Sequence, residues 1–146
     1  MGTRLAEKTV VVTGGASGIG AAIARGLAAE GANVMIADLD LAAGQRIADD
    51  IVAGGGAAAA VQADVTDRAA VRSAIESTVA RFGRLDVYFN NAGMNSPMRF
   101  LDITERNFET VMTVNALGVL TCPPRCSSRR AIPTTSRVRS SPSRAA

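Results

Sequence analysis

The chain has 146 residues, of which 47% are hydrophobic and 3% aromatic, and it carries a formal net charge of +3 with no histidine. Its length suits a single domain, and the lack of histidine excludes histidine-based catalytic triads and most zinc sites. No apolar run reaches the length of about eighteen residues that a membrane span needs, and residues 1–8 lack the apolar core of a secretory signal. We therefore expect a cytoplasmic protein that does not cross a membrane.

The charges divide the chain into two unequal parts. Residues 1–121 carry 10 basic and 13 acidic side chains, whereas residues 122–146 carry six arginines and no acidic residue. The second part also contains four of the five prolines and both cysteines, Cys122 and Cys126. Such a composition buries too little apolar surface to order itself, so we expect one domain over 1–121 and a disordered basic tail over 122–146. The two thiols, without further ligands, make a poor metal site.

Strand and helix patterns alternate along residues 8–121. Apolar runs predict strands at 8–13, 33–37, 57–63 and 86–89. Helical spacing of apolar residues follows each strand, and these helices are expected to begin at Gly18, after a cap at Asp40, after a cap at Thr66 or Asp67, and after a cap at Thr104. This order predicts an α/β fold with a doubly wound parallel sheet that stops after about four strands. Ligands of such sheets bind at the carboxyl ends of the strands.

The segment Thr13–Gly20 reads Thr-Gly-Gly-Ala-Ser-Gly-Ile-Gly and joins the first predicted strand to the first predicted helix. Glycines permit a tight turn there and let the backbone approach a phosphate closely. The helix N-terminus adds unpaired N–H groups and a partial positive charge. The loop therefore predicts a dinucleotide site, and the alternative is a tight turn without a ligand.

Acidic residues follow the second and third predicted strands. Asp38 lies 18 residues after Gly20, where a carboxylate can accept hydrogen bonds from both hydroxyls of an adenosine ribose. It would repel a 2′-phosphate, and no basic residue stands in the glycine loop or just after Asp38, so the sequence favours NAD over NADP. Asp64-Val65 offers a carboxylate and an apolar side chain to an adenine ring. The alternatives are that Asp38 and Asp64 only begin the helices that follow them.

Asparagines mark the end of the fourth strand and the last helix. The segment Asn90-Asn91-Ala92-Gly93 supplies uncharged donors and acceptors, or else it shapes a turn. Asn115 lies within the last predicted helix, where asparagine is a poor helix former. Its presence indicates a functional site, with a plain surface position as the alternative. We expect the glycine loop, Asp38, Asp64 and Asn90 to cluster at one edge of the sheet.

Together these segments resemble the N-terminal half of a short-chain dehydrogenase/reductase. The matching residues are Thr13-Gly14-x-x-x-Gly18-x-Gly20, Asp38, Asp64-Val65, Asn90-Asn91-Ala92-Gly93 and Val114-Asn115-x-x-Gly118. The resemblance covers residues 4–121 and implies a Rossmann-type fold, NAD as the cofactor, and hydride transfer between NAD(H) and a small alcohol or ketone. It also implies that intact relatives are homo-oligomers.

The resemblance implies roles for individual residues as well. Cofactor contacts fall at Gly14, Ser17, Gly18, Ile19, Gly20, Asp38, Asp64, Val65, Asn90, Ala92 and Gly93. Asn115 corresponds to the first member of an Asn-Ser-Tyr-Lys tetrad. In that tetrad a tyrosine acts as general base or acid, and a lysine four positions later lowers its pKa.

The chain departs from this family at the tetrad. Its one tyrosine, Tyr88, lies in the fourth predicted strand and is followed four positions later by Ala92, and its one lysine is Lys8. The Tyr-x-x-x-Lys pair is therefore absent, as are the fifth strand and the serine that it carries in the family. We interpret the chain as an NAD-dependent oxidoreductase that is truncated here and catalytically incompetent.

Two alternatives to this interpretation are a non-catalytic dinucleotide-binding fragment and a methyltransferase that uses S-adenosylmethionine. The Gly-x-x-x-Gly-x-Gly spacing and the Asn-Asn-Ala-Gly segment argue against the methyltransferase.

Residues 122–146 suggest a frameshift near the codon for Cys122, because GC-rich coding DNA read out of frame often yields Arg-, Pro-, Ser- and Ala-rich sequence. A basic tail for nucleic acid is the alternative. The segment has no aromatic residue to stack on bases, so we expect no nucleic-acid partner. Translating the other two frames beyond this codon tests the hypothesis, which fails if neither frame restores an apolar strand, a serine and Tyr-x-x-x-Lys.

Overall fold

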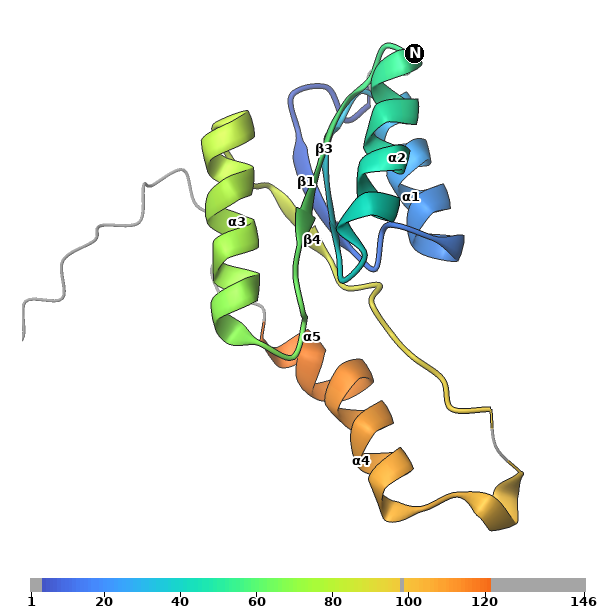
Figure 1. Ribbon diagram of the computed structural model, residues 1–146. Coiled ribbons are helices and arrows are strands. Elements are labelled where there is room, and N and C mark those ends of the chain that lie inside the picture. Colours follow the sequence, from blue (N-terminus) through green and yellow to red (C-terminus); the bar gives the residue numbers. More distant parts are fainter. Residues whose placement is uncertain (1–3, 98, 122–146) are drawn as a thin grey trace, which may run out of the picture.

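A four-stranded parallel sheet forms the centre of the molecule (Figure 1). The computed structural model describes residues 4–97 and 99–121. The strands, in the order β3-β2-β1-β4, are β3 (Ala57–Gln62), β2 (Asn33–Asp38), β1 (Thr9–Thr13) and β4 (Val87–Phe89). All three neighbouring pairs are parallel, which confirms the α/β fold class predicted from the sequence.

Each of the first three strands is followed by a helix: α1 (Gly18–Ala29), α2 (Leu41–Ala53) and α3 (Arg68–Phe82). The Asp40 carboxylate caps α2 by accepting a hydrogen bond from the Ala43 amide at 2.9 Å. Of the two predicted caps for α3, the structure uses Asp67, which accepts from the Ala69 amide at 2.8 Å. Side-chain acceptors at these positions satisfy amides that lack a partner within the helix.

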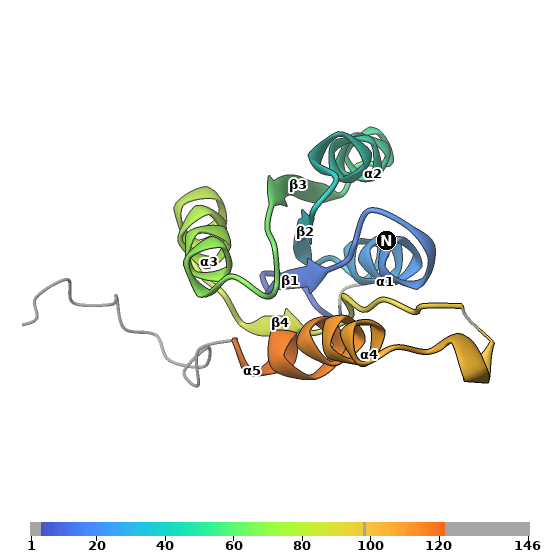
Figure 2. The same ribbon diagram turned by 60° about the horizontal axis from the view of Figure 1, so that its bottom comes forward.

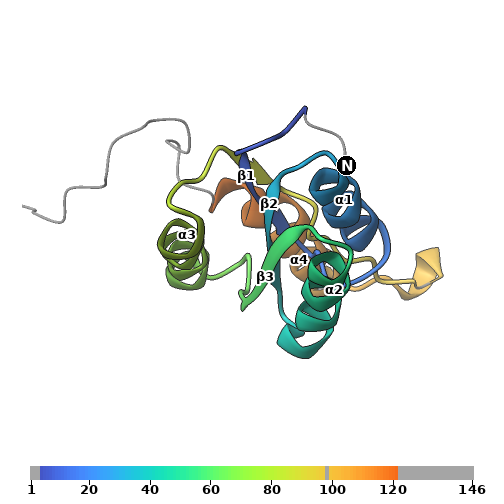
Figure 3. The ribbon, with the colours of Figure 1, turned by 90° about the horizontal axis from the view of Figure 1, so that it is seen from above.

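Helices cover both faces of the sheet. Figures 2 and 3 show α1 and α2 on one face and α3 on the other. Because successive side chains of a strand point to opposite faces, Val10 and Val12 pack on the α1–α2 side and Val11 packs on the α3 side. All five residues of β1 are buried, as expected for a central strand with helices on both faces.

Asp86, just before β4, ties this short strand to β1. Its carboxylate accepts hydrogen bonds from the Thr9 amide, at 2.9 Å, and from the Arg84 guanidinium, and Lys8 Nζ lies 3.8 Å away. Burial alone would raise the pKa of this carboxyl, but the hydrogen bonds and the two positive charges outweigh burial and hold its pKa below the ordinary value. Folding therefore stabilises the charged form of Asp86.

Residues 100–121 form short helical segments joined by turns. A 3-10 turn (Phe100–Asp102) precedes α4 (Glu105–Met112), a π-helical turn (Thr113–Leu117) and α5 (Gly118–Leu120). Thr104 caps α4 as predicted, in a reciprocal capping box with Asn107. We call residues 105–121 the helical arm; Figure 1 shows it at the end of the sheet where β3 leads into α3.

No helix within residues 4–97 and 99–121 is long and apolar enough to cross a membrane. The predicted basic tail, 122–146, lies outside the residues that the structure describes, as do both cysteines.

Candidate functional site

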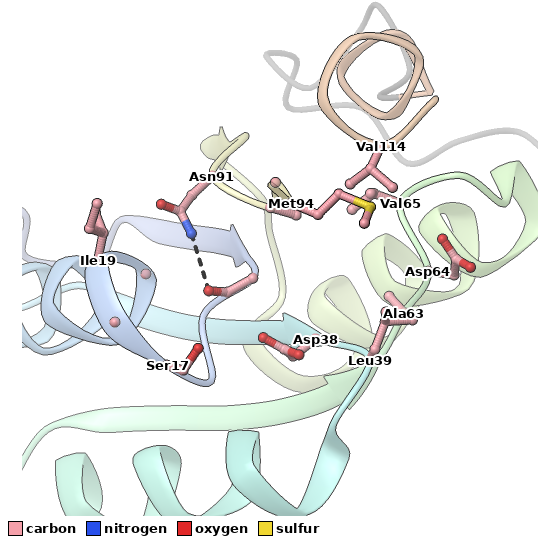
Figure 4. Close-up of a pocket in the computed structure, with 15 residues that line it drawn as sticks. Ser17, Ile19, Asp38, Leu39, Ala63, Asp64, Val65, Asn91, Met94 and Val114 are labelled. Carbon is pink, nitrogen blue, oxygen red and sulfur yellow. Dashed lines mark hydrogen bonds between the residues drawn. The ribbon is translucent and has the colours of Figure 1, made fainter. Parts of the chain in front are cut away.

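A pocket of about 550 Å³ opens at the carboxyl ends of the strands (Figure 4). The structure places ten of the twelve residues named from the sequence around it: Gly14, Ser17, Gly18, Ile19, Gly20, Asp38, Asp64, Val65, Ala92 and Gly93. Asn90 and Asn115 are not among the lining residues. Five further residues line the pocket: Asn91 and Val114, which belong to the matching motifs but were not predicted as cofactor contacts, and Leu39, Ala63 and Met94, which had no predicted role.

Two glycines at the start of α1, Gly18 and Gly20, shape the loop where it lines the pocket. A Cβ on Gly20 would lie 2.0 Å from the Gly14 carbonyl oxygen, so only glycine permits the first turn of α1 to contact the loop. Gly18 has a φ of +49°, and a Cβ there would meet nothing within 4 Å. The amides of this first turn have no partner within the helix. The result is an open cradle of N–H groups of the kind that binds phosphate.

Asn91 holds the glycine loop in place. Its Nδ2 donates to the carbonyl oxygens of Thr13, at 3.0 Å, and Gly14, at 3.1 Å; Figure 4 shows its side chain pointing at the loop. The buried Thr13 hydroxyl accepts from the amides of Asn91 and Ala92, both at 3.0 Å, and donates to the Phe89 carbonyl at 3.2 Å. These bonds join the ends of β1 and β4.

The Asp38 carboxylate lies at the pocket and bonds two different segments. Oδ2 accepts from the Ala16 amide of the glycine loop at 3.0 Å, and Oδ1 accepts from the Asp40 amide at 3.1 Å. The cap of α2 itself is Asp40, so capping does not account for Asp38. Among the described residues, those that line the pocket include two carboxylates and no arginine or lysine.

Asp64 and Val65 form the wall on the side of β3. Asp64 Oδ1 accepts from the amide and the hydroxyl of Thr66, at 2.8 and 2.7 Å, which shapes the turn before α3. These hydrogen bonds support the alternative interpretation of Asp64, in which it helps to begin the helix. The side chain nevertheless also lines the pocket.

Asn115 lies in the π-helical turn and contacts the segment after β4. Its Oδ1 accepts from the Met94 amide at 2.8 Å and its Nδ2 donates to the Met94 carbonyl at 2.9 Å. The side chain therefore braces the pocket wall at Met94, while its neighbour Val114 lines the pocket. Asn90 is exposed and does not line the pocket, so it does not join the predicted cluster of site residues.

Tyr88 and Lys8 lie away from the pocket. Tyr88 pairs with Val11 in the sheet and packs on the α3 side of the core. Lys8 precedes β1 and lies near Asp86, at the opposite end of the strands. Within the described part of the chain, no group of three or more Cys, Asp or Glu side chains has the arrangement of a metal site.

Comparison with known proteins identifies the family. The model of the short chain dehydrogenase family matches residues 8–128, which includes every element that surrounds the pocket. The chain belongs to the short-chain dehydrogenase family. Family members are oxidoreductases that use NAD or NADP, which favours this class over the methyltransferase alternative.

Several curated proteins are similar to this chain over most of its length. An uncharacterized oxidoreductase of Methylorubrum extorquens is 43% identical over 119 residues, 81% of this chain and 48% of the relative. Momilactone A synthase of Oryza sativa is 43% identical, over 79% of this chain and 42% of the relative. L-fucose dehydrogenase of Oryctolagus cuniculus is 41% identical, over 82% of this chain and 41% of the relative. The chain spans about half or less of the length of the curated relatives it matches.

Proposed function

We propose that the pocket binds NAD. The observation that carries this proposal is the position of Asp38, whose carboxylate faces the pocket beside the phosphate cradle of Gly18 and Gly20. In this assignment the first turn of α1 holds the pyrophosphate and Asp38 holds the adenosine ribose. Asp64 and Val65 face the adenine.

The nicotinamide side of the dinucleotide lies toward Ala92 and Gly93 in this assignment. Asn115 supports that wall through its two hydrogen bonds to the backbone of Met94.

Charge favours NAD over NADP in this proposal. A 2′-phosphate on the adenosine ribose would stand against the Asp38 carboxylate, and the lining residues of the described chain offer no cation to neutralise it. Like charges placed together without a counter-ion cost several kcal/mol. The same carboxylate accepts hydrogen bonds from free ribose hydroxyls.

We also propose that the 146-residue chain binds the cofactor without turning over a substrate. When bound, NAD supplies a hydride acceptor for the alcohol and, in its reduced form, a hydride donor for the ketone. Proton transfer to the substrate oxygen needs an acid or base near the nicotinamide. Tyr88 lies within the sheet and Lys8 at its far end, so neither can serve.

Isothermal titration of the 146-residue chain with NAD and NADP tests the binding proposal. NAD should bind at least about tenfold more tightly, a difference of roughly 1.4 kcal/mol. Asp38→Asn should narrow this gap, because it removes the charge that faces a 2′-phosphate. Asp49→Asn is the matched control, since it removes one exposed carboxylate from α2. Equal affinities for the two cofactors, or displacement of NAD by S-adenosylmethionine, would contradict the proposal.

The same preparation tests the absence of turnover. NADH formation from NAD and a panel of small alcohols should not exceed that of a protein-free control. A rate that rises with protein concentration would refute this part of the proposal. The family resemblance implies that longer relatives form homo-oligomers. Size-exclusion chromatography with light scattering on the same sample measures the oligomeric state of this chain.

A further inference from the structure

The helical arm contacts two walls of the pocket. Asn115 bonds the backbone of Met94, and Thr121 and Gly118 meet Val65 in the loop between β3 and α3. Figure 4 shows Val114, from the arm, above Val65 and the end of the Met94 side chain. The arm therefore borders the nicotinamide side of the pocket at Met94 and, at Val65, the part where we place the adenine.

Thr121, at the end of the arm, forms a long-range contact to Val65. Its Oγ lies 2.7 Å from the carbonyl oxygen of Val65 and 2.6 Å from that of Gly118. A hydroxyl has one proton, so it donates to one of these carbonyls at a time. Val65 lies 56 positions earlier in the sequence. The bond thus anchors the loop of Val65 from outside that loop.

Gly118 lets the arm approach Val65 closely. It is buried, and a Cβ at this position would lie 2.9 Å from Cγ2 of Val65. A side chain here would push on the residue that lines the pocket. Two independent contacts of the arm, one polar and one steric, therefore act on the same residue.

We propose that Thr121 is a positioning residue for purine recognition: its hydroxyl holds Val65 against the pocket so that an adenine ring can pack on it. The inference rests on the proposed function. It states that the helical arm contributes to the affinity of ligands that carry a purine ring. Loss of the Thr121 hydroxyl should therefore weaken the binding of purine ligands but not of pyrophosphate, because the amides that would bind phosphate, at Gly18 and Gly20, belong to a different segment of the chain.

The test is a titration of the 146-residue chain and its variants with NAD, ADP and inorganic pyrophosphate. Thr121→Val should weaken binding of NAD and ADP by about three- to tenfold, the effect of one typical hydrogen bond, and leave pyrophosphate affinity unchanged. Thr121→Ser keeps the hydroxyl and should restore both affinities. Thr110→Val is the matched control, since its hydroxyl bonds the Arg106 carbonyl within α4 at 2.8 Å.

Unchanged NAD affinity in a folded Thr121→Val variant would overturn the inference, and so would an equal loss of pyrophosphate binding. Should that variant fail to fold, Gly118→Ala replaces it: this change keeps the hydroxyl but displaces Val65, and full ADP affinity there would overturn the inference. A wild-type chain that binds pyrophosphate but neither NAD nor ADP would refute the proposed function and this inference together. NAD binding that no arm variant alters would refute the inference alone.

Discussion

Two glycines of α1 show how the same residue type has different consequences within one helix. A Cβ on Gly20 would lie 2.0 Å from the Gly14 carbonyl oxygen, whereas a Cβ on Gly26 would meet nothing within 4 Å. Gly20 is required for the contact between the loop and the helix. Gly26 is exposed, and its lack of a side chain only adds conformational freedom to the unfolded chain.

Alanine at these two positions should therefore have opposite effects. Gly20→Ala should abolish measurable NAD binding and lower the melting temperature, because the backbone of the loop must move. Gly26→Ala should raise the free energy of unfolding by about 0.5–1 kcal/mol and leave NAD affinity unchanged. Thermal melts and titrations of both variants measure this; wild-type affinity in Gly20→Ala would show that the loop does not hold the cofactor.

The adjacent residues Asn90 and Asn91 show why part of the site was not predictable from the sequence. Both follow β4, and neighbouring side chains of an extended segment point to opposite sides. The structure places Asn91 beside Thr13, where its side-chain amide donates to the glycine loop. Sequence spacing does not show which of the two asparagines faces the loop, and the predicted cofactor contact is Asn90.

Among the strands of the sheet, β4 has the fewest residues and the least burial. It has three residues and lies at an edge, with Val87 and Phe89 partly exposed. Asp86 compensates by bonding the Thr9 amide at the start of β1. The position of Asn91 and Ala92 depends on β4, so this electrostatic anchor at the far end of the sheet supports the pocket.

The anchor makes stability depend on pH. Folding lowers the pKa of the Asp86 carboxyl, so its contribution is complete above the ordinary aspartate value of about 3.9 and is lost as the pH falls through the lower folded value. Asp86→Asn should unfold at a lower denaturant concentration than wild type at neutral pH, and the difference should shrink in acid. Asp49→Asn provides the control for loss of one charge. A wild-type advantage over Asp86→Asn that stays constant into strong acid would contradict this account.

The helical arm was predicted less completely than the elements before it. The cap at Thr104 and the start of α4 follow from local sequence, and the structure confirms them. The π-helical turn at Thr113–Leu117 and the contact of Gly118 and Thr121 with Val65 do not follow from it. These features depend on residues distant in the sequence, which periodicity and capping rules do not connect.

Across the whole molecule, alternating apolar runs and helical patterns were sufficient to predict a parallel sheet with helices on both faces. That topology brings the ends of four strands together, so most residues named from separate motifs meet at one pocket. The apolar lining residues Leu39, Ala63 and Met94 give no comparable signal in the sequence, because aliphatic side chains are common in any core.

We propose that NAD binds at the glycine loop of this chain. Amide NMR spectra of the 146-residue chain during titration with NAD test it most directly, because they report the site as well as the affinity. We predict shifts concentrated at residues 14–20 and at Val65. A separate groove lies between α1 and α2 and is lined by Arg25 and Asp50. Shifts confined to that groove, or a spectrum that NAD leaves unchanged, would show that the glycine loop does not bind NAD.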